Sequence, residues 1–479
     1  MQDTILVFCQ NNQHAGLIAR TLRYREFCCL PVASATTAAA AAAMQPKGLI
    51  IAGQAGDTLE WLDYELLNLN VPVLALGSAA GVLCAHFGGA AACAVEENQG
   101  FAALSLENDP LFAELASGER MMSGLDELTL SDVLSPIASA NGKIIGFRHN
   151  LLPLYAMQYP IERNDPDGAQ MLANFAAICG MQPDWNDDAI IDRTVAAIRA
   201  AAPEGRVLCA VSGGVDSAVC AKLTSMAVGD RLMCVFIDTG MFRLHEPDDV
   251  IRRFMDHMNL VVAHVDAHDS FMRALSGVSD PRGKERIASQ LMNQMLLKQL
   301  AYDPEIKTVI MGTNFNDIFF GGTQDGSVVP ETVQICEPIR DLFKEEVRRL
   351  AVTLDLPASI TGRQPFPASG LALRVFGSLT EERLQLLRDA DAIFVEEVRE
   401  GGHDRRLWQY YATLIDSPDV PGSYAVCLRA TQSAGGGANA ARIPYDVLER
   451  AAERIRTELK GVTRIVYDLT PSAHYGELE

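Results

Sequence analysis

The 479-residue sequence has no apolar run of about 18 residues, the length that a helix needs to cross a membrane. It is also short of positive charge, with 40 Lys and Arg residues against 61 Asp and Glu residues and a formal net charge of −21. A protein that grips a nucleic-acid backbone needs a basic surface. We therefore expect neither a membrane span nor a nucleic-acid partner.

The sequence also lacks the marks of secretion. Its first residues, MQDTILVFCQ, contain no basic region followed by an apolar core and a cleavage site. The 11 cysteines are scattered, and only Cys28 and Cys29 are adjacent. They show neither the paired spacing of a zinc site nor the density of a small disulfide-bonded protein. These features favour a cytoplasmic protein.

What the sequence does contain is the alternation of an α/β protein. The chain is too long for one core, and residues 1–165 alternate short apolar runs with amphipathic stretches, which is typical of a layered α/β fold. The expected strands lie in TILVFC, GLIIAG, VPVLALG, KIIGF and LYAMQY. Residues 166–186 overlap the stretches NDPDGAQ and MQPDWNDD, and we interpret them as a linker.

A second alternation follows a periodic, helical segment at residues 187–201. Its expected strands lie in RVLCAV, LMCVFID, VVAHVDA and TVIMGT, with one helix from about Asp216 and another near residues 283–301. Strands that alternate with helices imply a parallel sheet. Residues 375–479 have a different pattern, in which helices alternate with YAVCLRA and RIVYDL, and this favours a small α+β domain.

The segment VLCAVSGGVDSAVCAKL, residues 207–223, joins a strand-like run to a helix-like run through a predicted phosphate loop, residues 212–217. Adjacent glycines allow successive N–H groups to point at one anion, and the helix that follows directs the positive end of its dipole there. The two serines add hydroxyl donors, and the carboxylate is a ligand for Mg²⁺. The loop consists of Ser212, Gly213, Gly214, Val215, Asp216 and Ser217.

This loop lacks the Gly-Lys-Ser ending of a Walker loop and resembles the loop of enzymes that split ATP between its α and β phosphates. Four further stretches look like the ATP-pyrophosphatase domain of GMP synthase. They are VFIDTGMFRLHE (235–246), SDPRGKERIASQ (279–290), VIMGTNFNDIFFGG (309–322) and EPIRDLFKEEVRRLAVTLDLP (337–357). RQPFPASGLALR (363–374), RIPYDVLERAAERI (442–455) and GVTRIVYDLT (461–470) resemble the dimerisation domain of that family.

The resemblance implies two doubly wound parallel-sheet domains followed by a small α+β dimerisation domain. Residues 1–181 would form a class I glutamine amidotransferase-like domain, residues 182–362 the ATP-pyrophosphatase domain, and residues 363–479 a domain that forms a homodimer. The substrate's carbonyl oxygen would attack the α-phosphate of ATP, and ammonia would then displace AMP.

On the same resemblance, the phosphate loop would hold pyrophosphate and Mg²⁺, with Asp216 as the metal ligand. Asp238 lies at the end of the next strand, where α/β folds place ligands. Gly312 and Thr313 would line the adenine side, and Lys344 would neutralise developing phosphate charge. The candidates on the side of the second substrate are Asp317, Arg340, Arg429, Arg442 and Tyr445.

The amidotransferase-like domain lacks two of the three catalytic residues of that class. A class I amidotransferase needs a Cys on a sharp turn after a strand and a His oriented by a Glu. In PVLALGSAAG (72–81) the nucleophile position is Gly77, and in YAMQYPIE (155–162) the His position is Pro160, although Glu162 persists. We expect no glutamine hydrolysis, and neither Ser78 nor Cys84 takes the place of the nucleophile.

The nucleotide-substrate side departs from the family as well. The segments GGTQDGSVVPET (321–332), DVPGSY (419–424), GGGAN (435–439) and PSAHYGELE (471–479) replace stretches that carry His, Asn, Arg or Lys in the family. Losing several charge-assisted contacts weakens the binding of a nucleotide phosphate. We therefore expect a small molecule with an activatable carbonyl as the substrate. An ammonia-dependent GMP synthase acting on xanthosine monophosphate, a nucleotide-binding pseudoenzyme and a sulfur transferase for tRNA are the alternatives.

Overall fold

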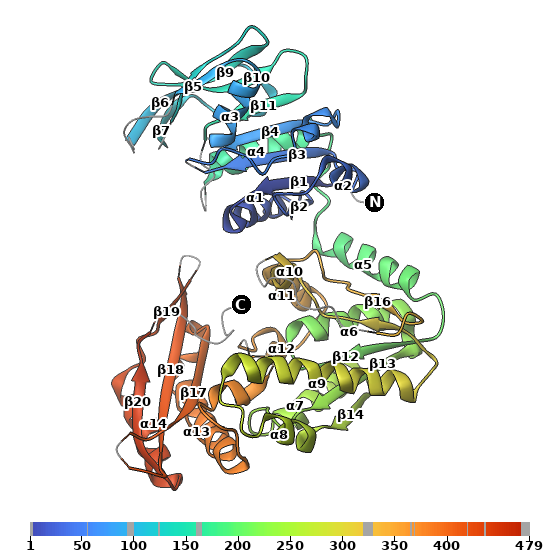
Figure 1. Ribbon diagram of the computed structural model, residues 1–479, viewed down its shortest axis with the longest axis vertical. Helices are drawn as coiled ribbons and strands as arrows, with labels where there is room; N and C mark the ends of the chain where they lie inside the picture. The colour runs from blue at the N-terminus through green and yellow to red at the C-terminus, as the bar shows by residue number, and fades with distance from the viewer. Residues whose placement is uncertain are drawn as a thin grey trace. The chain divides into compact units, whose positions relative to one another are not determined.

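The computed structural model divides into two compact units, Met1–Ile190 and Ile191–Glu479, each described by itself below (Figure 1). No helix in the described part of the chain is long and apolar enough to cross a membrane. The structure describes residues 3–54, 56–92, 100–122, 125–159, 165–319, 329–364, 366–367, 369–418, 420–434 and 437–470.

The first unit contains a nine-stranded sheet whose first five strands are parallel. They lie in the order β2 (Cys29–Val32), β1 (Ile5–Cys9), β3 (Gly48–Gly53), β4 (Val73–Gly77) and β11 (Leu154–Met157). Every residue of β1 and β3 is buried, as expected of strands that are covered on both faces. The strands predicted from the five apolar runs are all present.

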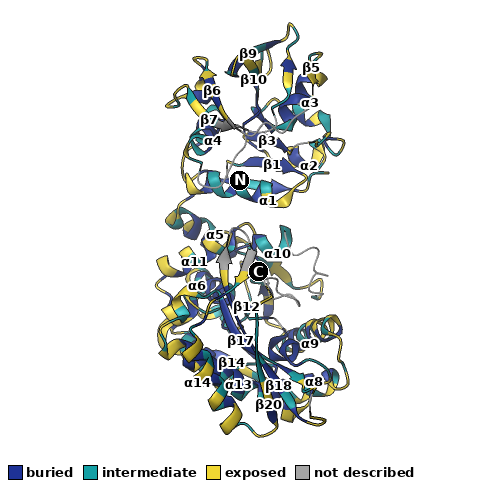
Figure 2. Ribbon diagram, turned by 90° about the vertical axis from the view of Figure 1, so that its left-hand side faces the viewer, coloured by how far each residue is buried: buried dark blue, intermediate teal, exposed yellow. Residues whose placement is uncertain are grey.

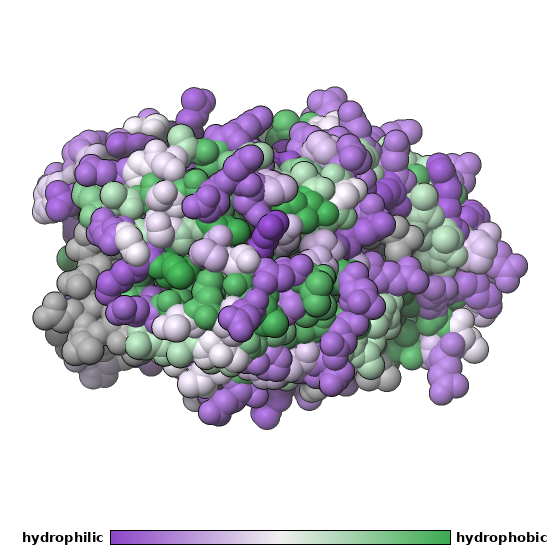
Figure 3. All heavy atoms as spheres, turned by 90° about the horizontal axis from the view of Figure 1, so that it is seen from above, coloured by the Kyte–Doolittle hydropathy of each residue, from purple (hydrophilic) through white to green (hydrophobic). Residues whose placement is uncertain are grey.

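The sheet continues beyond β11 in antiparallel strands that the apolar runs only partly predicted. They follow in the order β10 (Lys143–His149), β9 (Leu134–Ala140), β6 (Gly100–Leu106) and β7 (Gly118–Met122). A separate pair joins β5 (Ala90–Ala92) to β8 (Glu127–Thr129). In the space-filling view, hydrophobic residues are interspersed with hydrophilic ones (Figure 3).

The helices of the first unit include one that the sequence analysis assigned to a linker. This helix is α4 (Pro166–Ile178), and the linker assignment of residues 166–186 was wrong over this range. Asp165 caps the helix by accepting the backbone N–H of Asp167, and Pro166 fits the first turn, where its missing N–H costs nothing. The other elements are α1 (Asn12–Tyr24), α2 (Ala38–Ala43), α3 (Ser78–His86) and the 3₁₀ helices η1 (Tyr64–Asn68) and η2 (Pro110–Phe112).

The second unit begins with a parallel sheet, as predicted, and the sheet has five strands, one more than the four expected. Its order is β14 (Val262–Asp266), β13 (Leu232–Asp238), β12 (Arg206–Ala210), β15 (Ile306–Ile310) and β16 (Gln334–Cys336). From β12 the chain first builds one side of the sheet and then the other, so β12 and β15 border the topological switch point, where α/β folds bind ligands. The surrounding helices are α5 (Asp187–Ala201), α6 (Val215–Val228), η3 (Gly229–Arg231), α7 (Glu246–Met258), α8 (His268–Leu275), α9 (Pro281–Tyr302), α10 (Phe315–Phe319), α11 (Lys344–Thr353) and α12 (Ala358–Thr361).

The same unit ends in an α+β module with a four-stranded sheet. In that sheet β18 (Tyr424–Ala434) pairs antiparallel with β17 (Gln409–Asp416) and β19 (Gly437–Ala440) and parallel with β20 (Val462–Asp468). One hydrophobic core includes Leu208, Leu371 and Phe394, so the module packs continuously against the parallel sheet (Figure 2). Its helical elements are η4 (Gly370–Arg374), α13 (Glu381–Glu400), η5 (Asp404–Arg406) and α14 (Tyr445–Glu458).

Candidate functional site

The phosphate loop connects β12 to α6, and its backbone requires glycine. Gly213 has φ +76°, and a Cβ there would lie 2.3 Å from Val250 Cγ2. Ser217 Oγ accepts the backbone N–H of Ser212 at 3.2 Å and donates to Gly214 O at 3.0 Å, which holds the loop closed. Gly214 is the N-cap of α6 and supplies no side-chain cap, so the first N–H groups of the helix remain available to an anion.

An ion pair brings two predicted catalytic residues together beside this loop. Lys344 Nζ lies 2.5 Å from Asp216 Oδ2, and both side chains are about one-fifth exposed. Lys344 is the first residue of α11, and its backbone N–H donates to Asn316 Oδ1 at 3.1 Å. The lysine is therefore a partly buried component of the site rather than a solvated helix charge.

The second oxygen of the Asp216 carboxylate fits a cation. Oδ1 is buried and accepts no hydrogen bond from the residues that the structure describes. Mg²⁺ in nucleotide sites commonly takes one or two carboxylates and completes its shell with phosphate oxygens and water. Within the described residues there is no group of three or more His, Cys, Asp and Glu side chains that could hold a metal by itself. A metal at Asp216 would therefore depend on the phosphates of the substrate.

The segment after β15 packs against the first turn of α6. A Cβ on Gly312 would lie 3.6 Å from both Asp216 Cβ and Ser217 N, so Gly312 and the adjacent Thr313 border the loop. Asp317 Oδ2 accepts the backbone N–H of Asn314 at 2.9 Å. Burial raises the pKa of Asp317, and the negative charge of Asp216 acts in the same direction. Gly312 and Asp317 thus lie beside the first turn of α6, next to Asp216.

Asp238 ends β13 at the same carboxyl edge of the sheet, as expected. Its Oδ1 accepts the N–H of Gly240 at 2.9 Å, and its Oδ2 lies 3.4 Å from His264 Nε2 on β14. Because β13 is the direct neighbour of β12, this carboxylate and the phosphate loop emerge from adjacent strand ends.

The remaining substrate-side candidates have other contacts. Arg340 is half exposed and pairs with Glu337. Arg429 pairs with Asp468 at 2.9 Å and donates to Thr470 O at 3.0 Å, which ties β18 to the end of β20.

Arg442 and Tyr445 are exposed at the start of α14, where 78% of Tyr445 is accessible. A role in binding the second substrate remains a prediction for Arg340, Arg429, Arg442 and Tyr445.

In the first unit, the turn between β4 and α3 has room for glycine alone. Gly77 adopts φ +64° and ψ −134°, and a Cβ at this position would lie 2.3 Å from Gly53 O. Ser78 Oγ is buried, points toward Gly53 and has no hydrogen-bond partner among the described residues. Cys84 is fully buried, and burial raises the pKa of its thiol. Pro160 and Glu162 lie outside the described residues.

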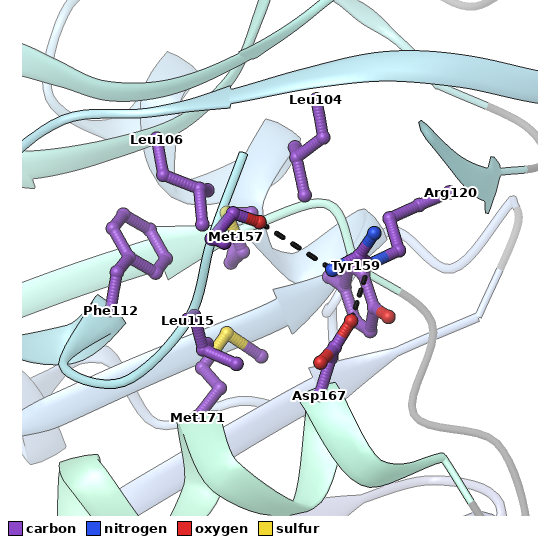
Figure 4. Close-up of a pocket in the computed structure, with 10 residues that line it drawn as sticks. Leu104, Leu106, Phe112, Leu115, Arg120, Met157, Tyr159, Asp167 and Met171 are labelled. Atoms are coloured by element: carbon purple, nitrogen blue, oxygen red, sulfur yellow. Dashed lines mark hydrogen bonds and ion pairs between the residues drawn. The ribbon is translucent and has the colours of Figure 1, made fainter. Parts of the chain in front are cut away.

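A small pocket lies beside the carboxyl end of β11 (Figure 4). Arg120 pairs with Asp167 at one side, and the other walls are mainly apolar, with Leu106, Met157 and Met171 among them. The cavity has a volume of about 20 Å³, which is room for a water molecule or a methyl group.

Comparison with known proteins assigns the chain to a family. The family model for the GMP synthase C terminal domain matches residues 396–474, and that for NAD synthase matches residues 190–382. GMP synthase [glutamine-hydrolyzing] of Carboxydothermus hydrogenoformans is 33% identical over 98% of this chain and 98% of its own length. The protein of the same name from Bacillus cytotoxicus is 35% identical over 98% of this chain and 97% of its own. The chain belongs to the GMP synthase family.

Membership in the GMP synthase family confirms the resemblance drawn from the sequence motifs and the mixed α/β fold with parallel sheets. The structure also brings to the phosphate loop a residue to which the sequence motifs gave no role. Arg363, the first residue of RQPFPASGLALR, lies against the phosphate loop and pairs with Glu246. The signal for it was present in the quoted motif, but the contact joins positions 151 residues apart.

Proposed function

We propose that this member of the GMP synthase family is an AMP-forming ligase that adenylates a carbonyl-bearing small molecule without hydrolysing glutamine. Family membership supports ATP-dependent ligase chemistry. The observation that carries the finer proposal is the contrast between two sites. The phosphate loop retains its glycines, hydroxyls and the Asp216–Lys344 pair, whereas Gly77 leaves no room for a nucleophile.

The proposed reaction has two displacements. The carbonyl oxygen of the substrate attacks the α-phosphorus of ATP, and the bond to the bridging oxygen breaks, so that pyrophosphate leaves. Ammonia or another nucleophile then attacks the activated carbon, and AMP departs with the former carbonyl oxygen while the nucleophile loses a proton. Both steps develop negative charge on phosphate oxygens, which preorganised donors stabilise.

The residues of the chain divide this work. The N–H groups at the start of α6 and the hydroxyls of Ser212 and Ser217 bind the departing pyrophosphate. Lys344 supplies a fixed positive charge, and Asp216 holds both this lysine and the metal. Mg²⁺, when bound, shields the charge of the phosphates. Gly312 and Thr313 form the wall on the adenine side, and Asp238 contributes a polar group at the next strand end.

We propose a substrate other than xanthosine monophosphate because the segments on that side depart from the family. An ammonia-dependent GMP synthase is the main alternative, and the full-length identity of 33–35% to proteins named GMP synthase favours it. A nucleotide-binding pseudoenzyme is the third candidate. We also propose a cytoplasmic location. The described residues contain no membrane-spanning helix, and their cysteines are free, which is consistent with a reducing compartment.

Turnover separates these candidates. The protein is incubated with MgATP, ammonium and a panel of carbonyl compounds that includes xanthosine monophosphate, and pyrophosphate and AMP are quantified. We expect equal release of pyrophosphate and AMP with at least one other carbonyl compound, and little GMP. Efficient formation of GMP would instead establish the ammonia-dependent GMP synthase. Tight ATP binding without turnover on any compound would favour the pseudoenzyme.

We also propose a homodimer formed through residues 363–479. This rests on the family of the C-terminal module, whose model matches residues 396–474. The buried face of α14, with Val447, Ala451 and Ile455, packs into the core of the same chain and is not itself the proposed interface. Sedimentation velocity at micromolar concentration should give the mass of a dimer. A chain truncated after residue 362 would lose part of the shared core, so the full chain is the appropriate sample. A monomer mass over the whole concentration range would contradict the proposal.

A further inference from the structure

The carboxylate of Glu246 holds Arg363 beside the phosphate loop and binds only two of the three nitrogens of the guanidinium group. Glu246 Oε1 accepts Nε at 3.0 Å and also accepts Nη2, and the two side chains are 11% and 16% exposed for Glu246 and Arg363 respectively. The remaining nitrogen, Nη1, faces the loop. It lies 3.5 Å from Ser212 O, at the limit of a hydrogen bond, and 3.7 Å from the position of a Cβ on Gly214.

The surroundings fix this orientation. Glu246 begins α7, and its Oε2 accepts the backbone N–H of Arg243 at 3.1 Å. The guanidinium carbon of Arg363 lies 5.6 Å from the centre of the Phe366 ring, which Arg243 and Arg374 also approach, at 5.3 and 5.1 Å. Cations over an aromatic face are stabilised there, so Arg363 is clamped between a carboxylate and a ring.

Carboxylates hold the guanidinium groups around the Phe366 ring. Asp391 is buried and lies 3.0 Å from Arg243 Nε and 3.8 Å from Arg374 Nη1, while Glu246 holds Arg363. Because Glu246 accepts from Nε and Nη2 of Arg363, Nη1 can donate to a phosphate oxygen at the loop without displacing this carboxylate.

We propose that Arg363 contacts the pyrophosphate part of ATP through Nη1, while Glu246 keeps its Nε and Nη2. The inference rests on the proposed ATP site and adds to it a residue from the segment that leads into the C-terminal module. The guanidinium is held by Glu246 on α7, whereas Asp216 pairs with Lys344 on α11, so the two cations reach the loop from different elements. The binding of ATP is thereby linked to the packing of that module.

The test compares ligands that do and do not contain the pyrophosphate group. Titration calorimetry of the full chain measures α,β-methylene ATP, which cannot be cleaved at that bridge, magnesium pyrophosphate and AMP. Arg363→Gln should lower the affinity for α,β-methylene ATP and for magnesium pyrophosphate at least tenfold, and should change the affinity for AMP less than twofold. Arg363→Lys retains the charge but not the planar fork, so an intermediate loss is expected. This variant also serves as the test if Arg363→Gln does not fold.

Two controls separate contact from structure. Glu246→Gln removes the carboxylate of the same ion pair but keeps the Arg363 guanidinium group at the loop. The affinity for the ATP analogue should therefore fall less than threefold. Arg252→Gln removes one positive charge from the exposed face of α7 and should have no effect. Equal losses in Arg363→Gln and Glu246→Gln, or unchanged affinities in Arg363→Gln, would overturn the inference alone. Failure of the unmodified protein to bind the ATP analogue and pyrophosphate would overturn the proposed function as well.

Discussion

Asp216→Asn is expected to lower ATP cleavage about 100-fold or more, the scale seen when one preorganised charged group is removed from a transition-state site. The substitution removes the negative charge that Lys344 Nζ contacts at 2.5 Å and replaces one carboxylate oxygen by a donor. It also removes a ligand for Mg²⁺ at the position of the buried, unpartnered Oδ1. Pyrophosphate release with the best substrate of the panel measures the effect.

The matched control for this variant lies at the other end of the same helical segment. Asp230, in η3 directly after α6, is exposed, and Asp230→Asn changes the net charge equally without altering the loop. Ser217→Ala should show a smaller loss, because it removes a hydroxyl that holds Ser212 N and Gly214 O. Unchanged ATP affinity and turnover in both Asp216→Asn and Ser217→Ala would refute the assignment of the phosphate loop.

Gly77→Cys is expected to destabilise the first unit by about 2–5 kcal/mol and to leave glutamine hydrolysis at background level. Backbone strain at positive φ costs about 1–3 kcal/mol, and forcing extra atoms into a packed site costs a similar amount. Here the new Cβ would lie 2.3 Å from Gly53 O, so the backbone must move before a thiol can point at any substrate. Thermal or denaturant unfolding and glutamate release from glutamine give the two readouts.

The control for Gly77→Cys separates backbone strain from collision. Gly142 also has a positive φ, +79°, and nothing lies within 4 Å of a Cβ built there, so Gly142→Cys places a side chain at positive φ without a clash. We expect Gly142→Cys to cost about 1–3 kcal/mol, the cost of positive φ without a collision. A Gly77→Cys protein as stable as the Gly142→Cys protein, or one that releases glutamate from glutamine, would show that the turn can admit a nucleophile.

The sequence predicted the helices, strands and loops of this molecule better than the contacts between distant segments. Glycine pairs, hydroxyls and a strand-to-helix junction are local signals, and the loop at residues 212–217 lies where they indicated. Local signals also misled: Asp165 and Pro166 were interpreted as linker residues although a capping Asp followed by Pro is equally typical of a helix start. The buried face of α4, with Leu172 and Phe175, decides between the two.

Contacts between distant segments could not be derived in the same way. Lys344 and Asp216 are 128 positions apart, and the sequence alone left a solvated helix charge as an alternative for the lysine. The Arg363–Glu246 pair joins positions 117 residues apart, and nothing in the spacing of the motif indicated it. Such pairs depend on the order of strands in the parallel sheet and on the packing of the C-terminal module against it.

By itself the sequence determined the α/β character, the phosphate loop and the absence of a cysteine at position 77, because each depends on residue type and short-range order. Only the tertiary structure decided that Asp216 and Lys344 meet, that Arg363 faces the same loop, and that Gly53 O occupies the space next to Gly77. The physical reason is that these are properties of close packing. Whether a charge is paired or a side chain has room depends on atoms that the chain brings together from distant positions.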